Sequence, residues 1–341
     1  MTTDPSPSPS SVTPSVDVFT SQLLAPAPTC VAAPARQAVR DRLLSAVPPL
    51  VDQLPTGEQV VITLPVLRQA RLGLDGTIGT DQPFAWKPAF ARRSLGLAAI
   101  DACLQHRYGT PAEAVAAVAD EAVATWMQTG WRTFHWEPWF GGLAVGARSA
   151  VLAEAATWAT ALWSAVDWNQ FVPVPTVGGP DDQWICTAAR TVRLKARSEL
   201  RIGVPGPACC RNGHDGADPV GADTGPPVAL VSVSSGVPSE EWPSELGFLA
   251  LVASLRSPSR PVPARVAGLW PDSGDQRMID VDAEVLQQAA DRVVDTVVQW
   301  AAARRNSVSS PTHQRGPGAA PPGGSAPGSS GPGPSSTDLM P

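Results

Sequence analysis

The pattern of apolar and polar residues changes its period along the chain, and the second half carries the clearer signal. From Arg190 to Gly203, apolar residues such as Val192 and Leu194 alternate with charged ones. Side chains two apart on a β-strand point to the same face, so this stretch predicts one strand with an apolar and a charged face. The stretch VALVSVSSG, Val228 to Gly236, is apolar at consecutive positions, which is typical of a strand in the interior of a sheet.

The first half of the chain shows helical periodicity instead, with apolar residues recurring every three or four positions. Thr110 and Pro111 indicate a helix start, because threonine is a favoured N-cap and proline fits the first helical position. The predicted helices span 36–47, 92–105, 111–129, 148–165, 239–256 and 282–305. Three further short strands are predicted at 59–63, 264–270 and 278–281.

The two ends of the chain differ in composition from the rest. Residues 1–35 are rich in Ser, Pro and Thr, and residues 306–341 are rich in Pro, Gly and Ser. Such segments bury too little apolar surface to offset their ordering entropy, so both are predicted to be disordered tails. The remainder, 36–305, predicts one α/β (α+β) domain, with a mainly helical part over 36–170 and a sheet core over 188–305.

The charge balance argues against a dedicated nucleic-acid binder. The formal net charge is −6 at pH 7, and the acidic excess persists in the domain because the tails hold one arginine and three aspartates. Nucleic-acid-binding proteins usually carry a basic excess, so such a role would need a local basic patch. The charged face of the first strand, with Arg193, Arg197 and Arg201, offers one candidate for nucleic-acid contact, although a solvated sheet edge explains it equally well.

The cysteines and the N-terminus indicate a cytoplasmic protein. Five cysteines are scattered along the chain in an odd number and without framework spacing, so reduced thiols are expected. No positively charged segment followed by an apolar run opens the chain, so no signal peptide is predicted. The long apolar stretch GGLAVGARSAVLAEAATWATALW contains Arg148 and Glu154, and it predicts a buried helix rather than a membrane span.

The two strands of the second half also carry candidate chemistry. Glu199 lies on the charged side of the first strand, and Ser232 and Ser234 share one face of the second. If the strands are neighbours, one carboxylate lies near a polar pair at a strand end. A metal-dependent nuclease needs a similar arrangement, in which one carboxylate on each strand holds Mg²⁺ and a lysine two residues after the second carboxylate assists the attacking water.

Four segments in this order, RSELRIG, LVSVSSG, SELGFLALVASLR and PARVAGLWPDSG, resemble the core of the PD-(D/E)XK nuclease superfamily, and more narrowly its RecB-type exonuclease domain. The resemblance covers about 190–305 and, more loosely, the helices before it. It implies a restriction-endonuclease-like fold: a mixed sheet of four to five strands flanked by helices, with an extra helical N-terminal part. In such relatives the first strand ends with Asp-Leu-x-x-Gly and the second with Asp-Leu-Lys-Thr-Gly.

The catalytic residues of that family are largely replaced in this chain. By the resemblance, Glu199 stands for the first acid, Ser232 for the second, Ser234 for the lysine and Ser235 for the threonine, while Gly236 keeps the glycine. Serine is neutral at pH 7, so the site keeps one carboxylate where Mg²⁺ usually needs at least two, and it holds no ammonium group. The resemblance therefore implies a degenerate, inactive nuclease fold that binds DNA or a protein partner and needs no cofactor.

Two alternatives remain open. In the first, the protein is an active Mg²⁺-dependent DNA nuclease with a migrated site, in which Glu199 binds the metal together with groups from elsewhere in the chain. The supporting residues would be Glu154, Lys195, Glu240, Glu241 and Glu245. The last three glutamates also suit the N-terminus of a helix, and Lys195 suits a solvated face. In the second alternative, the chain is a structural or interaction scaffold with no nucleic-acid role.

Two other stretches have simpler interpretations. The insert CCRNGHD, with Cys209, Cys210 and His214, resembles a metal loop, but adjacent cysteines rarely both bind one ion. The run WMQTGWRTFHWEPWF is expected to pack mostly in the core, because tryptophan buries a large apolar surface. His135 within this run is expected to be a packed or capping residue rather than a catalytic base.

Overall fold

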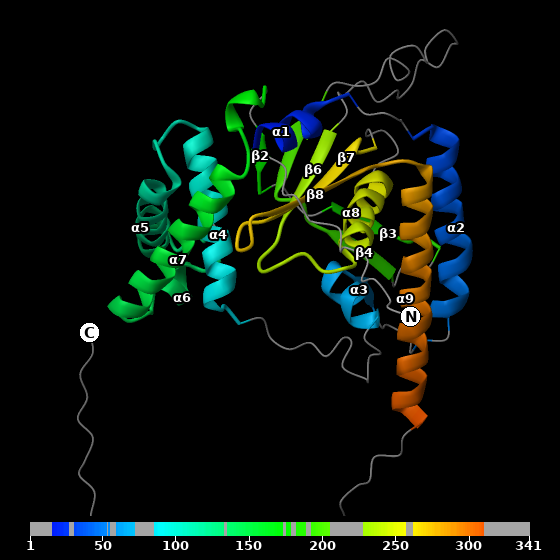
Figure 1. Cartoon of the computed structure of the whole chain (residues 1–341). Helices are drawn as coiled ribbons and strands as arrows, with labels where there is room; N and C mark the ends of the chain where they lie inside the picture. The colour runs from blue at the N-terminus through cyan, green and yellow to red at the C-terminus, as the bar shows by residue number, and fades with distance from the viewer. Residues whose placement is uncertain are drawn as a thin grey trace, which may run out of the picture.

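Two mixed β-sheets, with helices on both sides of the larger one, form the architecture of the computed structural model (Figure 1). The structure describes residues 16–26, 31–52, 54, 59–71, 85–132, 135–172, 175–178, 182–188, 192–204, 228–256 and 262–309. The mixed α/β class predicted from the sequence is confirmed. The sequence predicts one sheet, however, and the described residues form two.

The larger sheet has five strands in the order β2-β5-β6-β7-β8. They are β2 (Thr176–Val177), β5 (Leu200–Gly203), β6 (Val228–Val233), β7 (Arg265–Trp270) and β8 (Asp275–Asp280). Helix α8 (Trp242–Arg256) crosses from β6 to β7, which makes this pair parallel, and the other neighbouring strands are antiparallel. β6 lies between two strands and is buried on both faces, as its continuous apolar sequence predicts.

The smaller sheet has three strands in the order β1-β4-β3. β1 (Val60–Ile62) runs parallel to β4 (Val192–Ala196), and β3 (Asp182–Ile185) runs antiparallel to it. The prediction of one continuous strand over 190–203 is therefore wrong, because the chain leaves the small sheet after Ala196 and enters the large sheet at Leu200. The alternating pattern continues across this break because β4 and β5 each bury alternate side chains.

Helices α1, α4 and α7 cover one face of the large sheet, and α5 and α6 pack outside α4 and α7 (Figure 1). Their bounds are α1 (Val16–Leu24), α4 (Pro88–Leu104), α5 (Pro111–Thr129), α6 (Glu137–Gly141) and α7 (Val145–Ser164). α4 and α7 approach closely where Gly96 faces the ring of Trp158. Trp136 and Trp158 are buried, as expected for most of the tryptophans, whereas Trp131 is exposed.

Helix α8 covers the opposite face of the large sheet and also contacts the small sheet. Around it lie α2 (Ala33–Val51), α3 (Leu64–Arg71) and α9 (Ala283–Ser309), with α2 and α9 side by side (Figure 1). α8 is buried from Glu245 to Leu255, because it packs between the sheets and the α2–α9 pair. The predicted helices 239–256 and 282–305 thus correspond to α8 and α9.

The helix at Val16–Leu24 corrects the prediction of a disordered tail for that part of 1–35. Val16–Leu24 forms helix α1, and Phe19 and Leu23 are buried in the core formed with the large sheet. These two residues lie four positions apart, so a single helical face carries both. The Ser, Pro and Thr content around them hides this short amphipathic segment from a prediction based on composition.

Helix α2 continues through Pro48 and Pro49, where the sequence predicts its end. Val47 and Val51 flank the two prolines and are buried, and the N–H of Asp52 donates to the carbonyl oxygen of Pro48 at 3.0 Å. The free energy gained by packing the last turn thus exceeds the cost of the two backbone hydrogen bonds that proline, which has no N–H, is unable to donate.

The long apolar stretch that ends near Trp163 forms most of α7, so the predicted helix is confirmed, but it is buried on one side only rather than throughout. Val151, Ala155 and Leu162 are buried on its inner side, and Glu154 is exposed. Within the described ranges, the helices lack the combination of length and apolar character that crossing a bilayer requires.

Candidate functional site

One edge of the large sheet gathers the residues that the sequence singles out. β6 and β7 are parallel, so their carboxyl ends meet at this edge, and the antiparallel β5 begins there. Glu199 directly precedes β5, and Ser234 directly follows Val233 at the end of β6. The condition set by the sequence is met, because β5, which follows Glu199, pairs with β6, which holds Ser232. Ligands of open α/β sheets bind at the carboxyl ends of parallel strands, so this edge is the candidate site.

Glu199 is fully buried, which corrects the expectation that it lies on a solvent-facing charged side. Its Oε2 accepts a hydrogen bond from the N–H of Val233 at 2.8 Å, between the two serines of β6. Its Oε1 accepts a hydrogen bond from Nη2 of Arg93, on helix α4. Each oxygen of this carboxylate is therefore already bound to a donor of the protein.

An irregular main chain explains why Glu199 turns inward. Val231 is the register partner of Leu200, yet its carbonyl oxygen accepts the N–H of Glu199 at 2.9 Å. Two consecutive residues thus face one residue of β6, which is the arrangement of a β-bulge. Bulges redirect side chains, and here the bulge coincides with the passage of the chain from the small sheet to the large one.

Burial raises the pKa of the Glu199 carboxyl above its ordinary range, because a charge is costly in a dry environment. The positive charge of Arg93, the hydrogen bond from Val233 and the charge of Arg197 each lower this pKa, but they do not cancel the effect of burial. The site thus holds an acid whose charged form depends on the neighbouring arginine.

The two serines lie in different surroundings. Ser232 is buried and is the register partner of Gly268 in β7. The ring of Trp270 covers Gly268, since a Cβ atom added there would lie 2.6 Å from Cζ3 of Trp270. Ser234 is half-buried, and its N–H donates to the carbonyl oxygen of Leu269 at 2.9 Å. These positions offer only neutral hydroxyl groups beside Glu199.

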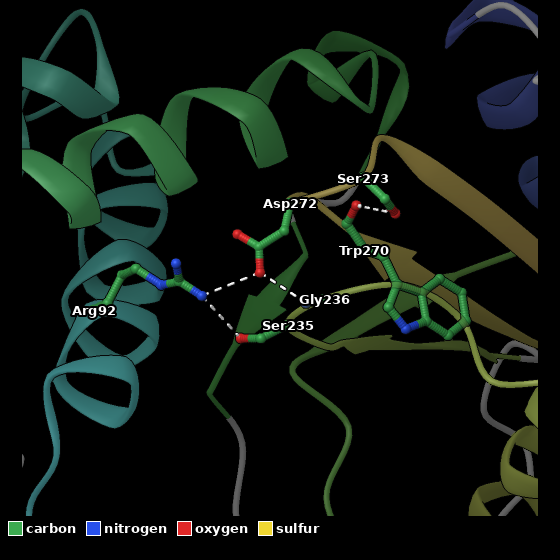
Figure 2. Close-up of polar contacts among 6 residues, drawn as sticks. All are labelled: Arg92, Ser235, Gly236, Trp270, Asp272 and Ser273. Carbon is green, nitrogen blue, oxygen red and sulfur yellow. Dashed lines mark hydrogen bonds and ion pairs between the residues drawn. The ribbon is translucent and has the colours of Figure 1, made fainter.

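A second arginine of α4 bridges the loops that follow β6 and β7 (Figure 2). Nη2 of Arg92 donates to Oγ of Ser235 at 3.3 Å and to Oδ2 of Asp272 at 3.1 Å. The same Oδ2 accepts the N–H of Gly236 at 2.7 Å, and Gly236 has the positive φ of 81° that favours glycine. Asp272 is therefore part of the site. The sequence does not single it out, because an aspartate in a segment such as PDSG is common in turns.

Consecutive arginines of one helix thus pair with the two acids of this edge. Arg92 pairs with Asp272 and Arg93 with Glu199. The sequence places these partners more than a hundred positions apart, so neither pair carries a local signal. In a divalent metal site, carboxylate oxygens must be available to the ion. The residues of this edge do not fit a Mg²⁺ site, because a guanidinium already neutralises each carboxylate.

The residues proposed for a migrated site, four glutamates and one lysine, either pair with arginines other than Arg93 or are exposed. Glu245 is buried, with Oε1 and Oε2 each 2.6 Å from a nitrogen of Arg68, and Glu241 accepts a hydrogen bond from Arg292 at 2.8 Å. Glu154, Glu240 and Lys195 are exposed. Across the described ranges, three or more His, Cys, Asp or Glu side chains nowhere gather closely enough to hold a metal ion.

Glu245 differs from Glu199 in its electrostatics. Burial raises the pKa of Glu245, but the hydrogen bonds and charge of Arg68 outweigh burial, and the resulting pKa lies below the ordinary range. The hydroxyl of Ser239 also donates to Oε1 of Glu245 at 3.0 Å. Glu245 is thus a charged structural partner of Arg68 at the start of α8.

The basic face predicted for one strand is divided between two sheets. Arg193 and Lys195 belong to β4 in the small sheet, whereas Arg201 belongs to β5 in the large one. Arg201 pairs with the buried Asp182. That aspartate also pairs with an arginine at the end of α8, at 2.6 Å. Arg197 is exposed between the sheets. The break after β4 thus places Arg193 and Arg201 in different sheets, and nucleic-acid contact by these arginines stays a prediction.

The remaining candidates have simpler outcomes. Cys209, Cys210 and His214 lie outside the described residues. Cys103 and Cys186 are buried free thiols, as expected for reduced cysteines. His135 is exposed and has a positive φ of 65°, so the expectation of a packed residue is wrong.

Comparisons with protein families and with curated proteins found no match for this chain. The contacts at the sheet edge therefore carry the functional argument.

Proposed function

We propose that the protein is a non-hydrolytic binding module built on a nuclease-like sheet. The observation that carries this proposal is the pairing of Glu199 with Arg93. The carboxylate that stands at the position of the family's first acid is fully buried, and its oxygens accept hydrogen bonds from Arg93 and Val233. A guanidinium cation thus takes the place that a divalent ion would need beside this acid.

The serines support the same proposal. A phosphodiester nuclease of this type needs a second carboxylate and an ammonium group beside the first acid. Ser232 and Ser234 supply neither charge, and Asp272 is held by Arg92 and Gly236. The edge keeps the hydrogen-bonded framework of a site without the groups that activate water, which suits binding of a nucleic acid or a protein rather than hydrolysis.

The first experiment measures cleavage of single- and double-stranded DNA with Mg²⁺ and with Mn²⁺. The proteins are the wild type, Glu199→Ala, the double variant Ser232→Asp with Ser234→Lys, and this double variant with Arg93→Ala. We expect no cleavage by the wild type. Cleavage by the double variant, increased when Arg93 no longer competes with the metal for Glu199, would support a nuclease ancestry with a degenerate site.

Binding of fluorescent DNA is measured in parallel by anisotropy at low salt, where counterion release favours any phosphate contact. Two outcomes would replace this proposal. Cleavage by the wild type that Glu199→Ala abolishes would identify an active nuclease. Absence of DNA binding together with absence of cleavage by all four proteins would favour the scaffold alternative.

A further inference from the structure

A pocket of about 660 Å³ lies beside the candidate site, between α4, α5 and the segment of β2. Pockets that hold small molecules commonly have volumes of roughly 300–1,000 Å³ and apolar walls with a few polar groups. The walls here include Leu97 of α4, Val118 of α5 and Val177 of β2. The pocket therefore has the size and the partly apolar lining of a small-molecule site.

The charged groups of the pocket are unevenly satisfied. Arg107 pairs with Glu121, so these two charges offset each other. Asp101 accepts a hydrogen bond from the side-chain amide of Gln105 at 2.8 Å. Arg197, in contrast, is exposed, and among the described residues it makes no close ion pair, although its charge acts on Glu199. An exposed cation that is not in a close ion pair with a described residue thus lines the pocket together with Val177 of β2.

Arg93 adds further donors at that end. It lines the pocket, and one terminal nitrogen contacts Glu199. Its Nε is buried and has no hydrogen-bond partner. A guanidinium carries five N–H donors in a planar fork that matches carboxylate and phosphate oxygens. The buried Nε does not face the open pocket, but the Arg93 side chain is partly exposed, so Arg93 and Arg197 together bring positive charge to the pocket.

We propose that this pocket binds a small organic anion, a carboxylate or phosphate monoester carried on an apolar body. Arg93 and Arg197 bind the anionic group, and Leu97, Val118 and Val177 contact the apolar body. The proposal goes beyond the function proposed above, because it requires neither a nuclease ancestry nor binding of nucleic acid. Its tests use no DNA, so the two proposals succeed or fail separately.

The test uses the full chain and the fluorescent aromatic sulfonate 8-anilinonaphthalene-1-sulfonate as the probe. We expect saturable binding to the wild type. Arg197→Gln should weaken binding by about tenfold or more, because hydrogen bonds between charged groups are strong. Arg193→Gln is the matched control, since this arginine lies on β4 outside the pocket lining, and it should bind as the wild type does.

Two filling variants and a set of competitors complete the test. Ala98→Phe and Thr125→Trp add bulk to the pocket from α4 and α5, and each should abolish probe binding while circular dichroism shows a folded protein. Benzoate and phenyl phosphate should displace the probe, whereas the neutral benzamide should not. Whichever anion displaces at the lower concentration identifies the preferred anionic group.

Glu199→Gln tests the part assigned to Arg93. Glutamine still offers an oxygen to the N–H of Val233 but no longer attracts the guanidinium, so the anion should bind several times more tightly. The proposal is overturned if the wild type does not bind the probe. It is equally overturned if Arg197→Gln and both folded filling variants bind as the wild type does, because the probe then binds elsewhere. Weaker binding by Glu199→Gln would remove Arg93 from the site.

Discussion

Arg93 and Glu199 form an ion pair in which the glutamate is wholly buried and the arginine side chain is 38% exposed. The two partners are therefore not equivalent. Water is able to solvate Arg93 when its partner is removed, whereas Glu199 has no access to water when Arg93 is removed. This asymmetry predicts different costs for substitutions at the two positions.

We expect Arg93→Met to reduce the free energy of unfolding at pH 7 by roughly 2 kcal/mol. This is less than the cost of breaking an ion pair in which both side chains are buried, because Arg93 is partly exposed. Glu199→Gln should cost about 1 kcal/mol or less, because the amide oxygen still accepts the N–H of Val233. Urea denaturation measures both values. Equal costs would show that the buried charge of Glu199 is not what Arg93 stabilises.

The raised pKa of Glu199 predicts a pH dependence of stability. The folded protein binds this proton more tightly than the unfolded chain does. The contribution of Glu199 is therefore largest at acid pH and falls as the pH rises from about 4.3, the ordinary value for glutamate, through the raised pKa. Glu199→Gln lacks this decline, so its stability relative to the wild type should improve between pH 4 and pH 8. The exposed Glu154→Gln is the matched control.

Glu245 predicts the opposite pH dependence, because its pKa is lowered in the folded protein. The stability from its pairing with Arg68 is present above the ordinary pKa of glutamate and is lost as the pH falls through the lowered value. Arg68→Met should thus cost about 1 kcal/mol at pH 7, given that Arg68 is half exposed, and less at pH 3. Arg42→Met removes an exposed pair with Asp291 and should have little effect at either pH. A cost for Arg68→Met that grows toward acid pH would contradict the assignment.

Local signals made several elements predictable from the sequence. Helix α5 begins and ends as predicted, because the hydroxyl of Thr110 accepts the N–H of Glu113 at 3.4 Å and Gly130 follows with a positive φ of 70°. The interior position of β6 follows from its unbroken apolar sequence. In each case the information lies within a few residues of the element itself.

The break between β4 and β5 and the arginines of the site depend on distant contacts instead. No glycine or proline marks the passage from Ala196 to Leu200, and the alternating pattern is the same on both sides of it. The partners of Glu199 and Asp272 come from α4, which precedes them by 106 and 180 positions. A single sequence indicates that Arg92 and Arg93 are charged but not which acids they meet.

The bridge made by Arg92 predicts a hierarchy of effects in the two loops (Figure 2). Asp272→Ala removes the acceptor for both Arg92 and the N–H of Gly236, so it should cost about 1–2 kcal/mol. Arg92→Ala removes only the bridge and should cost about 0.5 kcal/mol. A double-mutant cycle measured by urea denaturation should give a coupling of about 0.5–1 kcal/mol. A larger cost for Arg92→Ala than for Asp272→Ala would show that the loops depend on the arginine rather than on the aspartate.

The contact between Gly96 and Trp158 sets the distance between α4 and α7. A Cβ atom added to Gly96 would lie 2.7 Å from Cζ3 of Trp158, and the ring is buried, so it has little room to move. Gly96→Ala should therefore cost roughly 1–3 kcal/mol through overpacking, although alanine favours a helix more than glycine does.

Gly146 provides the matched control for this substitution. It lies in the first turn of α7, and apart from its chain neighbours and the adjacent helix backbone no described atom lies within 4 Å of the place where its Cβ would be. Gly146→Ala should leave stability unchanged or raise it by up to about 1 kcal/mol, because only helix propensity changes. Thermal and urea unfolding of both variants separate packing from propensity. If Gly96→Ala were as stable as Gly146→Ala, α4 and α7 would be able to move apart without cost. Arg92 and Arg93, on the same helix, would then not be held in place by this contact.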